Sequence, residues 1–240
     1  MAKTQNPNLS GDLKRFINLK GNLLSYEIQE EILQDVVKNK CPDHSSYEYV
    51  EIKVKLLNLF YSTDIQATGK VARQIYGIKN IDQILAQHPM CSKNLVDKIA
   101  NLSLSGKSRN NYSFATKYCA LHQPDKYPIY DKIVSEIFVF LMKSGNLPPY
   151  QYTRSKSNGT KMSVTGFRNK LRDYNFFVQV YDAFRTAYGL TGVSYRKIDW
   201  YLWGTFKDGK FKSKIEKLAK IKKIYKVYAV PKINRVNIQP

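Results

Sequence analysis

Two neighbouring segments decide the fold of this 240-residue chain: residues 101–117, NLSLSGKSRNNYSFATK, and residues 127–131, YPIYD. The first segment predicts the end of one helix, a glycine-containing turn of small polar residues, and a second helix. The second segment predicts an extended turn fixed by Pro128 and an aspartate, Asp131, where the next helix begins. The predicted order is therefore helix, hairpin, helix, turn and helix.

Outside these segments the apolar residues recur mostly at helical spacing, which predicts an all-α fold. Residues 49–61 alternate like a strand in their first half, but we interpret them as a helix because the second half has helical spacing. Residues 150–161 are polar and contain a glycine, so they predict an exposed loop. The expected helices span about residues 25–40, 49–61, 69–76, 80–87, 92–102, a stretch from just after 108 to 121, 130–143, 164–188, 194–203 and 213–228.

The chain carries a large positive charge, because 39 Lys and Arg residues against 19 Asp and Glu residues give a formal net charge of +20. Such a surplus destabilises a compact monomer by self-repulsion and points to a polyanionic partner. The charge is spread over the chain rather than gathered in one amphipathic helix, so we expect double-stranded DNA and not a membrane surface. With 43% hydrophobic and 13% aromatic residues, the chain is not a disordered one.

We expect a cytoplasmic protein that acts as a monomer. The longest apolar run, residues 137–142, is far shorter than the roughly 20 residues that cross a membrane. The first residues lead into no apolar stretch of a signal peptide, and three cysteines are too few for a disulfide scaffold.

The hairpin supplies five candidates for DNA binding: Gly106, Lys107, Ser108, Arg109 and Asn110. A tight hairpin of small residues exposes backbone N–H groups at the start of the following helix, where a phosphate can bind. Lys107 and Arg109 add positive charge to this clamp. The Gly-Lys-Ser sequence also ends P-loops, but Asn101 stands where that motif requires glycine, so we exclude a nucleotide-binding loop.

Four motifs resemble the helix-hairpin-helix superfamily of DNA glycosylases, in particular a small bacterial branch with an 8-oxoguanine DNA glycosylase-like fold. Residues 104–109, LSGKSR, stand in the hairpin, and residues 127–131 look like the aromatic-Pro-Ile/Val-x-Asp segment. Residues 113–118, SFATKY, resemble an Ala-Ser-Lys element of that branch. Residues 195–203, YRKIDWYLW, resemble the Ile-Asp-x-x-Leu-Trp helix that closes its domain.

This resemblance covers roughly residues 50–206 and implies a two-lobed helical domain. The hairpin of the family has a Leu-Pro-Gly-Val-Gly-type sequence, and three positions here depart from it. Ser105 replaces Pro, Ser108 replaces the second Gly, and Asn110 stands at the lyase position instead of Lys. We divide the chain into an N-terminal helical segment (1–48), a helix-hairpin-helix glycosylase-like domain (49–206) and a basic C-terminal extension (207–240).

The resemblance implies that Asp131 is the catalytic carboxylate and that a lysine forms a Schiff base with the sugar. Our candidate is Lys117, which lies seven positions or two helical turns beyond Asn110 and therefore near the same face. The alternatives are a solvated lysine for Lys117 and a helix N-cap for Asp131. The aromatic candidates to hold a flipped base, with the core as their alternative, are Phe114, Tyr130, Trp200 and Trp203.

We expect no metal and no other cofactor. Each cysteine has a histidine three positions away, in the pairs Cys41 and His44, His88 and Cys91, and Cys119 and His122. A tetrahedral zinc site built from two pairs is the alternative, but the pairs fall in three different elements. Some helix-hairpin-helix glycosylases hold an iron–sulfur cluster with four cysteines near the C-terminus, and no cysteine follows Cys119.

The sequence therefore predicts a DNA glycosylase that flips out and excises a damaged or modified base, with AP-lyase activity if Lys117 reaches the sugar. The rival prediction is a non-catalytic helix-hairpin-helix module that binds duplex DNA. The excised base stays open because specificity depends on the shape of the pocket. The biological role also stays open between DNA repair and defence against phages with modified bases.

Overall fold

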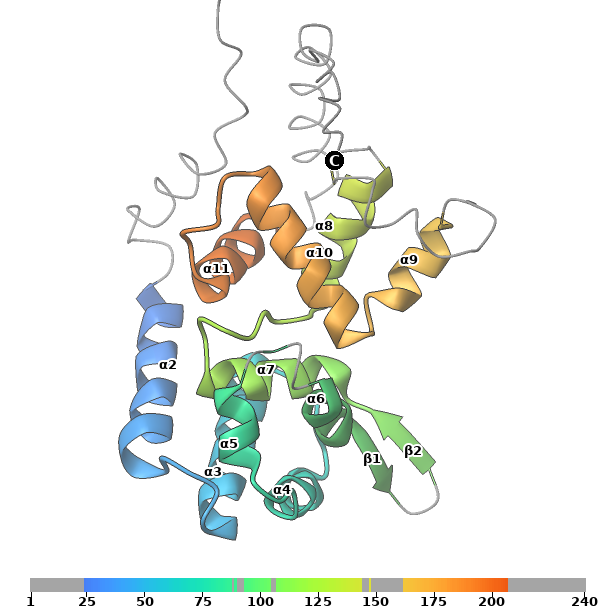
Figure 1. The fold of residues 1–240 in the computed structure, drawn as a ribbon. Coiled ribbons are helices and arrows are strands. Elements are labelled where there is room, and N and C mark those ends of the chain that lie inside the picture. Colours follow the sequence, from blue (N-terminus) through green and yellow to red (C-terminus); the bar gives the residue numbers. More distant parts are fainter. Residues whose placement is uncertain are drawn as a thin grey trace, which may run out of the picture.

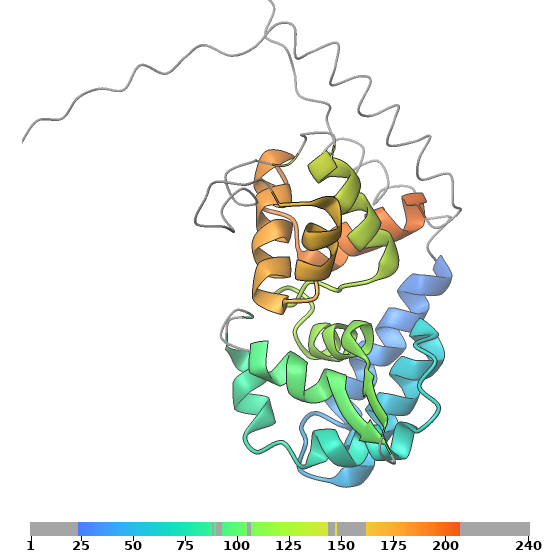
Figure 2. The same ribbon diagram turned by 90° about the vertical axis from the view of Figure 1, so that its right-hand side faces the viewer.

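The computed structural model of the protein describes residues 24–87, 89, 93–104, 107–143, 147 and 162–206. Within these residues the chain forms two lobes of helices, one stacked on the other (Figures 1 and 2). The all-α prediction is confirmed, with one short β-hairpin added to it. The predicted loop at 150–161 and the basic helix at 213–228 lie outside the described residues.

The first lobe is the lower one in Figure 1 and contains residues 47–122. Its elements are α3 (Tyr47–Tyr61), α4 (Thr68–Tyr76), α5 (Ile81–Ala86), α6 (Lys93–Ala100), β1 (Asn101–Leu104), β2 (Lys107–Asn110) and α7 (Tyr112–His122). Helix α7 lies at the top of this lobe, next to the second lobe (Figure 1). It is mostly buried, so its side chains reach both the core and the boundary between the lobes.

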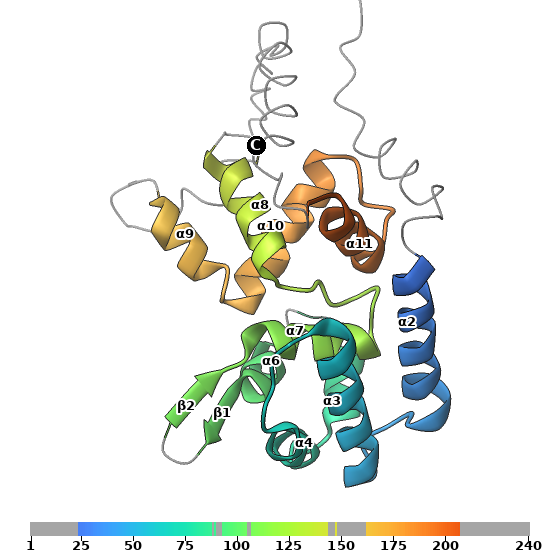
Figure 3. The same ribbon diagram turned by 180° about the vertical axis from the view of Figure 1, so that it is seen from behind.

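The second lobe consists of α8 (Lys132–Lys143), α9 (Val164–Lys170), α10 (Tyr174–Ala187) and α11 (Tyr195–Phe206). Outside both lobes, α2 (Leu24–Asp35) and the short π-helix η2 (Val36–Lys40) run along one side of the molecule (Figure 3). Helix α2 packs against α3, and its Glu30 pairs with Arg196 of α11. It therefore joins the two lobes on that side.

Aromatic residues also hold the lobes together. Residues 123–131 connect α7 to α8, and in this segment Pro128 O accepts a hydrogen bond of 3.2 Å from the Tyr174 hydroxyl. The Tyr174 ring stacks on Tyr127, with 6.2 Å between ring centres and 15° between planes. From the first lobe, the Tyr112 hydroxyl donates to Leu171 O at 3.4 Å. Buried rings of this size contribute about 1.5–3 kcal/mol each, so the boundary between the lobes is firmly packed.

The hairpin differs from the prediction. Residues 101–110 form two antiparallel strands in which Asn101 faces Asn110 and Leu104 faces Lys107. Helix α6 ends at Ala100 instead of residue 102, and α7 begins only at Tyr112. The alternation of Leu and Ser in residues 102–104 fits a strand better than a helix, because successive strand residues point to opposite sides.

This β-hairpin changes the expected DNA clamp. Residues 107–110 are an extended strand paired with β1, so their N–H groups do not form the row expected at the start of a helix. Gly106 and the side chains of residues 107–109 lie outside the described part of the structure.

The long helix expected at 164–188 is also two helices. Helix α9 ends at Lys170, and the Asp173 carboxylate accepts a hydrogen bond of 3.2 Å from the Phe176 N–H to begin α10. Ser194 caps α11, as the sequence predicts, and Ser46 caps α3, which was not predicted. Asp173 divides the predicted helix because its side chain caps the start of a new one. The apolar stripe continues across the break, since both helices pack on the same core.

Lys53 is fully buried in the first lobe. Its ammonium donates a hydrogen bond of 2.6 Å to the backbone oxygen of Asp43. Burial lowers the pKa of Lys53 to about 8, although Asp82, Cys41 and Asp43 act in the opposite direction. The folded protein therefore releases this proton at a lower pH than the unfolded chain does.

We expect Lys53→Met to flatten the rise of stability with pH. Between about pH 8 and 10 the unfolded chain keeps the Lys53 proton and the folded protein has lost it, so the wild-type free energy of unfolding rises by up to about 1.4 kcal/mol per pH unit from this group. Urea denaturation from pH 7.5 to 9.5 measures the slope. Lys55→Met, on the exposed side of α3, is the control, and equal slopes for both variants would contradict the assignment.

Candidate active site

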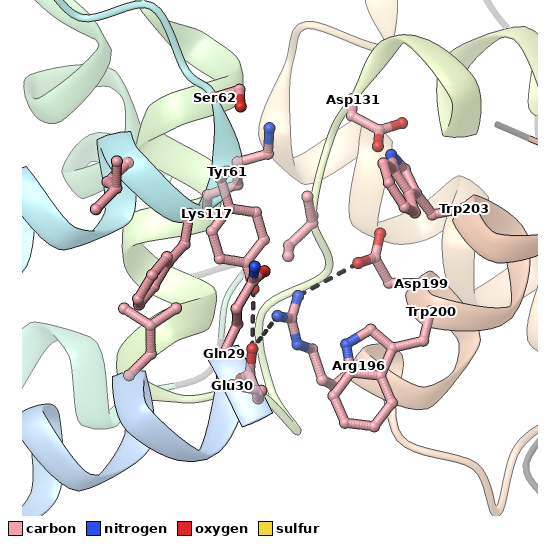
Figure 4. Close-up of a pocket in the computed structure, with 14 residues that line it drawn as sticks. Gln29, Glu30, Tyr61, Ser62, Lys117, Asp131, Arg196, Asp199, Trp200 and Trp203 are labelled. Atoms are coloured by element: carbon pink, nitrogen blue, oxygen red, sulfur yellow. Dashed lines mark hydrogen bonds and ion pairs between the residues drawn. The ribbon is translucent and has the colours of Figure 1, made fainter. Parts of the chain in front are cut away.

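A cavity of about 600 Å³ lies between the two lobes, and Figure 4 shows the side chains around it. Its walls come from α2, the end of α3, α7, the segment before α8, and α11. Four residues selected from the sequence line this one cavity: Lys117, Asp131, Trp200 and Trp203. A volume between about 300 and 1,000 Å³ is typical of pockets that hold small organic groups.

Lys117 extends into this cavity from α7. Its Nζ lies 5.7 Å from the centre of the Tyr61 ring, and among the described residues its ammonium forms no hydrogen bond or ion pair. Burial lowers the pKa of Lys117, while the carboxylates of Asp131 and Asp199 oppose the shift. Lys117 is thus not a solvated surface lysine, and its amine is more readily uncharged than that of a free lysine.

Asp131 lines the opposite side of the cavity, at the start of α8. The Val134 N–H donates a hydrogen bond of 2.7 Å to Asp131 Oδ1, so this carboxylate caps the helix. Burial raises the pKa of Asp131, and the Val134 N–H, the Lys117 ammonium and the Ile133 N–H oppose the rise. The interpretation of Asp131 as a helix N-cap is confirmed, and the same carboxylate lines the cavity with Lys117. Its catalytic role stays a prediction.

A buried charge cluster completes the cavity. Arg196 Nη1 donates to Asp199 Oδ2 at 3.3 Å, and the same guanidinium forms an ion pair with Glu30 of α2. The Tyr61 hydroxyl donates to Glu30 Oε2 at 3.0 Å. The second carboxylate oxygen of Asp199 is buried without a hydrogen-bond partner among the described residues.

Acidic side chains outnumber basic ones on the cavity wall. Two cations, Lys117 and Arg196, face three carboxylates, those of Glu30, Asp131 and Asp199. Burial raises the pKa of Asp199 to about 7, although Arg196 opposes the rise. The Asp199 carboxyl group therefore binds a proton more readily than a free aspartate does.

Sequence reasoning missed most of this cluster. Arg196 and Asp199 lie in the stretch 195–203 that carries the resemblance, and their i, i+3 spacing was the available signal. Glu30 and Tyr61 gave no signal, because only the fold brings α2 and the end of α3 to α11.

Two of the four aromatic candidates lie elsewhere. Phe114 is in the core, with 2% of its surface exposed, and Tyr130 packs against Tyr112 with 4.8 Å between ring centres. Both line a smaller neighbouring cavity, together with the hairpin candidate Asn110. Phe60 and Tyr61, which were not selected from the sequence, line the main cavity instead.

The two described Cys–His pairs come together through their histidines, His44 before α3 and His122 at the end of α7. His44 Nδ1 is 2.6 Å from Asp82 Oδ1, and His44 Nε2 is 2.9 Å from the Tyr118 hydroxyl. The His122 ring packs against His44, with 4.8 Å between ring centres. Among the described residues, which exclude His88 and Cys91, no group of three or more possible ligands is placed to hold a metal ion.

The fold and the cavity define a mostly helical protein with a buried, ionisable pocket between two lobes. A family model, HI_0787_N, described as an N-terminal domain, matches residues 9–126. A Haemophilus influenzae protein described as an uncharacterized protein is 30% identical over 172 residues, which make up 72% of this chain and 73% of that protein. The chain belongs to the same family as this Haemophilus protein. No solved structure matches it.

No helix in the described part of the chain is long and apolar enough to cross a membrane.

Proposed function

We propose that the protein is a DNA glycosylase that excises a damaged or modified base. The observation that carries the proposal is the meeting of Lys117 and Asp131, from different lobes, in one cavity with aromatic walls. The resemblance of residues 104–131 and 195–203 to the helix-hairpin-helix glycosylases supports it. The net charge of +20 is suited to double-stranded DNA as the partner.

The chemistry needs a nucleophile and a carboxylate on the same sugar. As the N-glycosidic bond breaks, positive charge develops on the sugar, and an ionised Asp131 stabilises it. The uncharged amine of Lys117 attacks the anomeric carbon and forms a C–N bond as the bond to the base breaks, and the departing base takes up a proton. The attached nitrogen then loses a proton, the bond between the anomeric carbon and the ring oxygen breaks, and the ring oxygen takes up a proton, which leaves a protonated Schiff base on the opened sugar. Burial of Lys117 favours the uncharged amine that this step requires.

The remaining walls are suited to a flipped base. Trp200, Trp203 and Tyr61 supply aromatic faces for stacking, and the cavity is large enough for a nucleobase. The cavity is bounded on one side by α2, so the base would be enclosed between α2 and the two lobes. We place this activity in the cytoplasm, with the protein acting as a monomer.

The rival function is a duplex-binding module without chemistry, for which Asp131 is needed only as the cap of α8. Asp131→Asn separates the two, because asparagine caps helices as well as aspartate does and lacks the charge. Purified protein is incubated with duplexes that carry a panel of damaged and phage-type modified bases, and released base is measured.

We expect the wild type to release at least one base, and Asp131→Asn to lower that rate by about 10²-fold or more. Asp125→Asn, an exposed position in the same connecting segment, should keep the wild-type rate. Salt-dependent DNA binding with no product from any duplex would favour the binding module instead.

A further inference from the structure

A second cavity, of about 310 Å³, adjoins the first. Lys117 and Ser62 line both, so they stand where the two cavities meet. The second cavity is formed by the turn after α3, the start of α7 and the turn between α9 and α10, and it therefore also lies between the lobes.

The start of α7 presents hydrogen-bond donors to this cavity. The Tyr112 N–H is taken by Asn110 Oδ1 at 3.1 Å, but the N–H groups of Ser113 and Phe114 belong to the first helical turn, where no intrahelical acceptor exists. Partial positive charge gathers at such a helix start.

Asn111 gives an independent sign of a ligand. Its side chain lines the cavity with only 9% of its surface exposed, yet among the described residues its carboxamide forms no hydrogen bond. Asn111 occupies the N-cap position of α7 without capping it. This carboxamide is therefore largely enclosed at the cavity wall and is free to bond a ligand that occupies the cavity.

Charge separates the two cavities. Three carboxylates line the first cavity. The described lining residues of the second cavity include no carboxylate but two cations, Arg172 and Lys117. The Arg172 side chain is exposed and forms no ion pair among the described residues. The neighbouring carboxylate of Asp173 is engaged by the Phe176 N–H.

The turn after α3, which lines the second cavity, is held in place by hydrogen bonds to Asn58. Asn58 Oδ1 accepts from the Thr63 hydroxyl at 2.7 Å and from the Ile65 N–H at 2.9 Å. This bracing holds Ser62 in the left-handed region, with φ of 45°, at the junction of the cavities. Its position is therefore fixed by its neighbours rather than by its own backbone preference.

We propose that the second cavity binds a backbone phosphate of DNA, next to the nucleotide whose base enters the first cavity. Arg172 and the start of α7 contact the phosphate from the two lobes, and Asn111 donates its amide to it. The inference rests on the proposed function for the identity of the ligand. It adds Arg172 and Asn111, which the sequence did not select, to the helix start where the sequence predicted a phosphate.

The test measures binding and requires no catalysis. Fluorescence anisotropy gives the Kd for a duplex with a tetrahydrofuran abasic-site analogue, and for the same duplex with uncharged methylphosphonates on both sides of the analogue. Arg172→Ala should weaken binding of the phosphodiester duplex about tenfold and binding of the methylphosphonate duplex less than about twofold. The slope of log Kd against log salt concentration should be smaller by about one for Arg172→Ala than for the wild type.

Matched variants separate the contact from net charge. Lys170→Ala removes the same charge from the same turn region but does not line the cavity, and should change both affinities alike and less. Asn111→Asp adds a negative charge at the same shape and should weaken phosphodiester binding selectively, whereas Asn94→Asp on α6 should not.

Equal losses on both duplexes for Arg172→Ala, or no loss on either, would overturn the phosphate site. A selective loss together with no base release from any duplex would keep the phosphate site and overturn the glycosylase. The two proposals therefore fail separately.

Discussion

Lys117→Met is expected to abolish the covalent adduct that borohydride traps between the protein and a cleaved duplex. Methionine keeps an unbranched stem at the cavity wall and removes the amine that we propose as the nucleophile. Removing a catalytic nucleophile lowers rates by roughly 10³- to 10⁶-fold. We expect a loss in this range for strand cleavage, with DNA affinity nearly unchanged.

The measurement is gel analysis of adducts and of cleaved strands at several pH values. In the wild type the adduct should increase with pH as Lys117 loses its proton, and burial places this increase below the pH at which a free lysine titrates. Lys132→Met, an exposed position at the start of α8, removes the same charge and should trap normally. An adduct that persists in Lys117→Met would assign the nucleophile to another residue.

The second large effect concerns stability. Arg196→Met is expected to lower the free energy of unfolding by about 3–5 kcal/mol at pH 7, because the buried Glu30 carboxylate loses its cation and Asp199 is buried either charged without a cation or protonated far above its ordinary pKa. Urea denaturation followed by circular dichroism measures the loss. The loss should shrink as the pH falls, since burying a protonated Asp199 then costs less.

An exposed ion pair provides the control. Arg168 on α9 pairs with Glu136, and both side chains are partly solvated. Arg168→Met should cost at most about 1 kcal/mol. Adding Asp199→Asn to Arg196→Met should recover part of the lost stability, and a cost for Arg196→Met no larger than the control would show that the buried cluster contributes little.

Much of the helical framework could be predicted from local signals. Ser194 and the periodic apolar residues after it mark α11, and Pro148–Pro149 or Pro42 mark where helical patterns stop. The divided helix at 164–188 could not be predicted in the same way, because α9 and α10 keep one apolar stripe on both sides of Asp173. Periodicity reports which residues are buried and says little about a turn within the pattern.

The candidate site, too, could be predicted only in part. Lys117 and Asp131 were selected by motif and spacing, and the structure brings them to one cavity. Glu30 could not be selected, because it lies in the segment that we assigned to a separate N-terminal part, and only the packing of α2 against α3 and α11 brings it near Arg196. Residues that join distant segments leave no local pattern.

The order of the two lobes along the chain has a consequence for how the site is assembled. The described elements of each lobe are consecutive along the chain, α3 to α7 in the first and α8 to α11 in the second, so the contacts inside a lobe close short loops of chain. Lys117 belongs to the first lobe, and Asp131 immediately precedes the second. A backbone cut within residues 123–130 would leave the amine on one fragment and the carboxylate on the other. Neither fragment alone contains the pair, so activity would require that the two pieces reassociate.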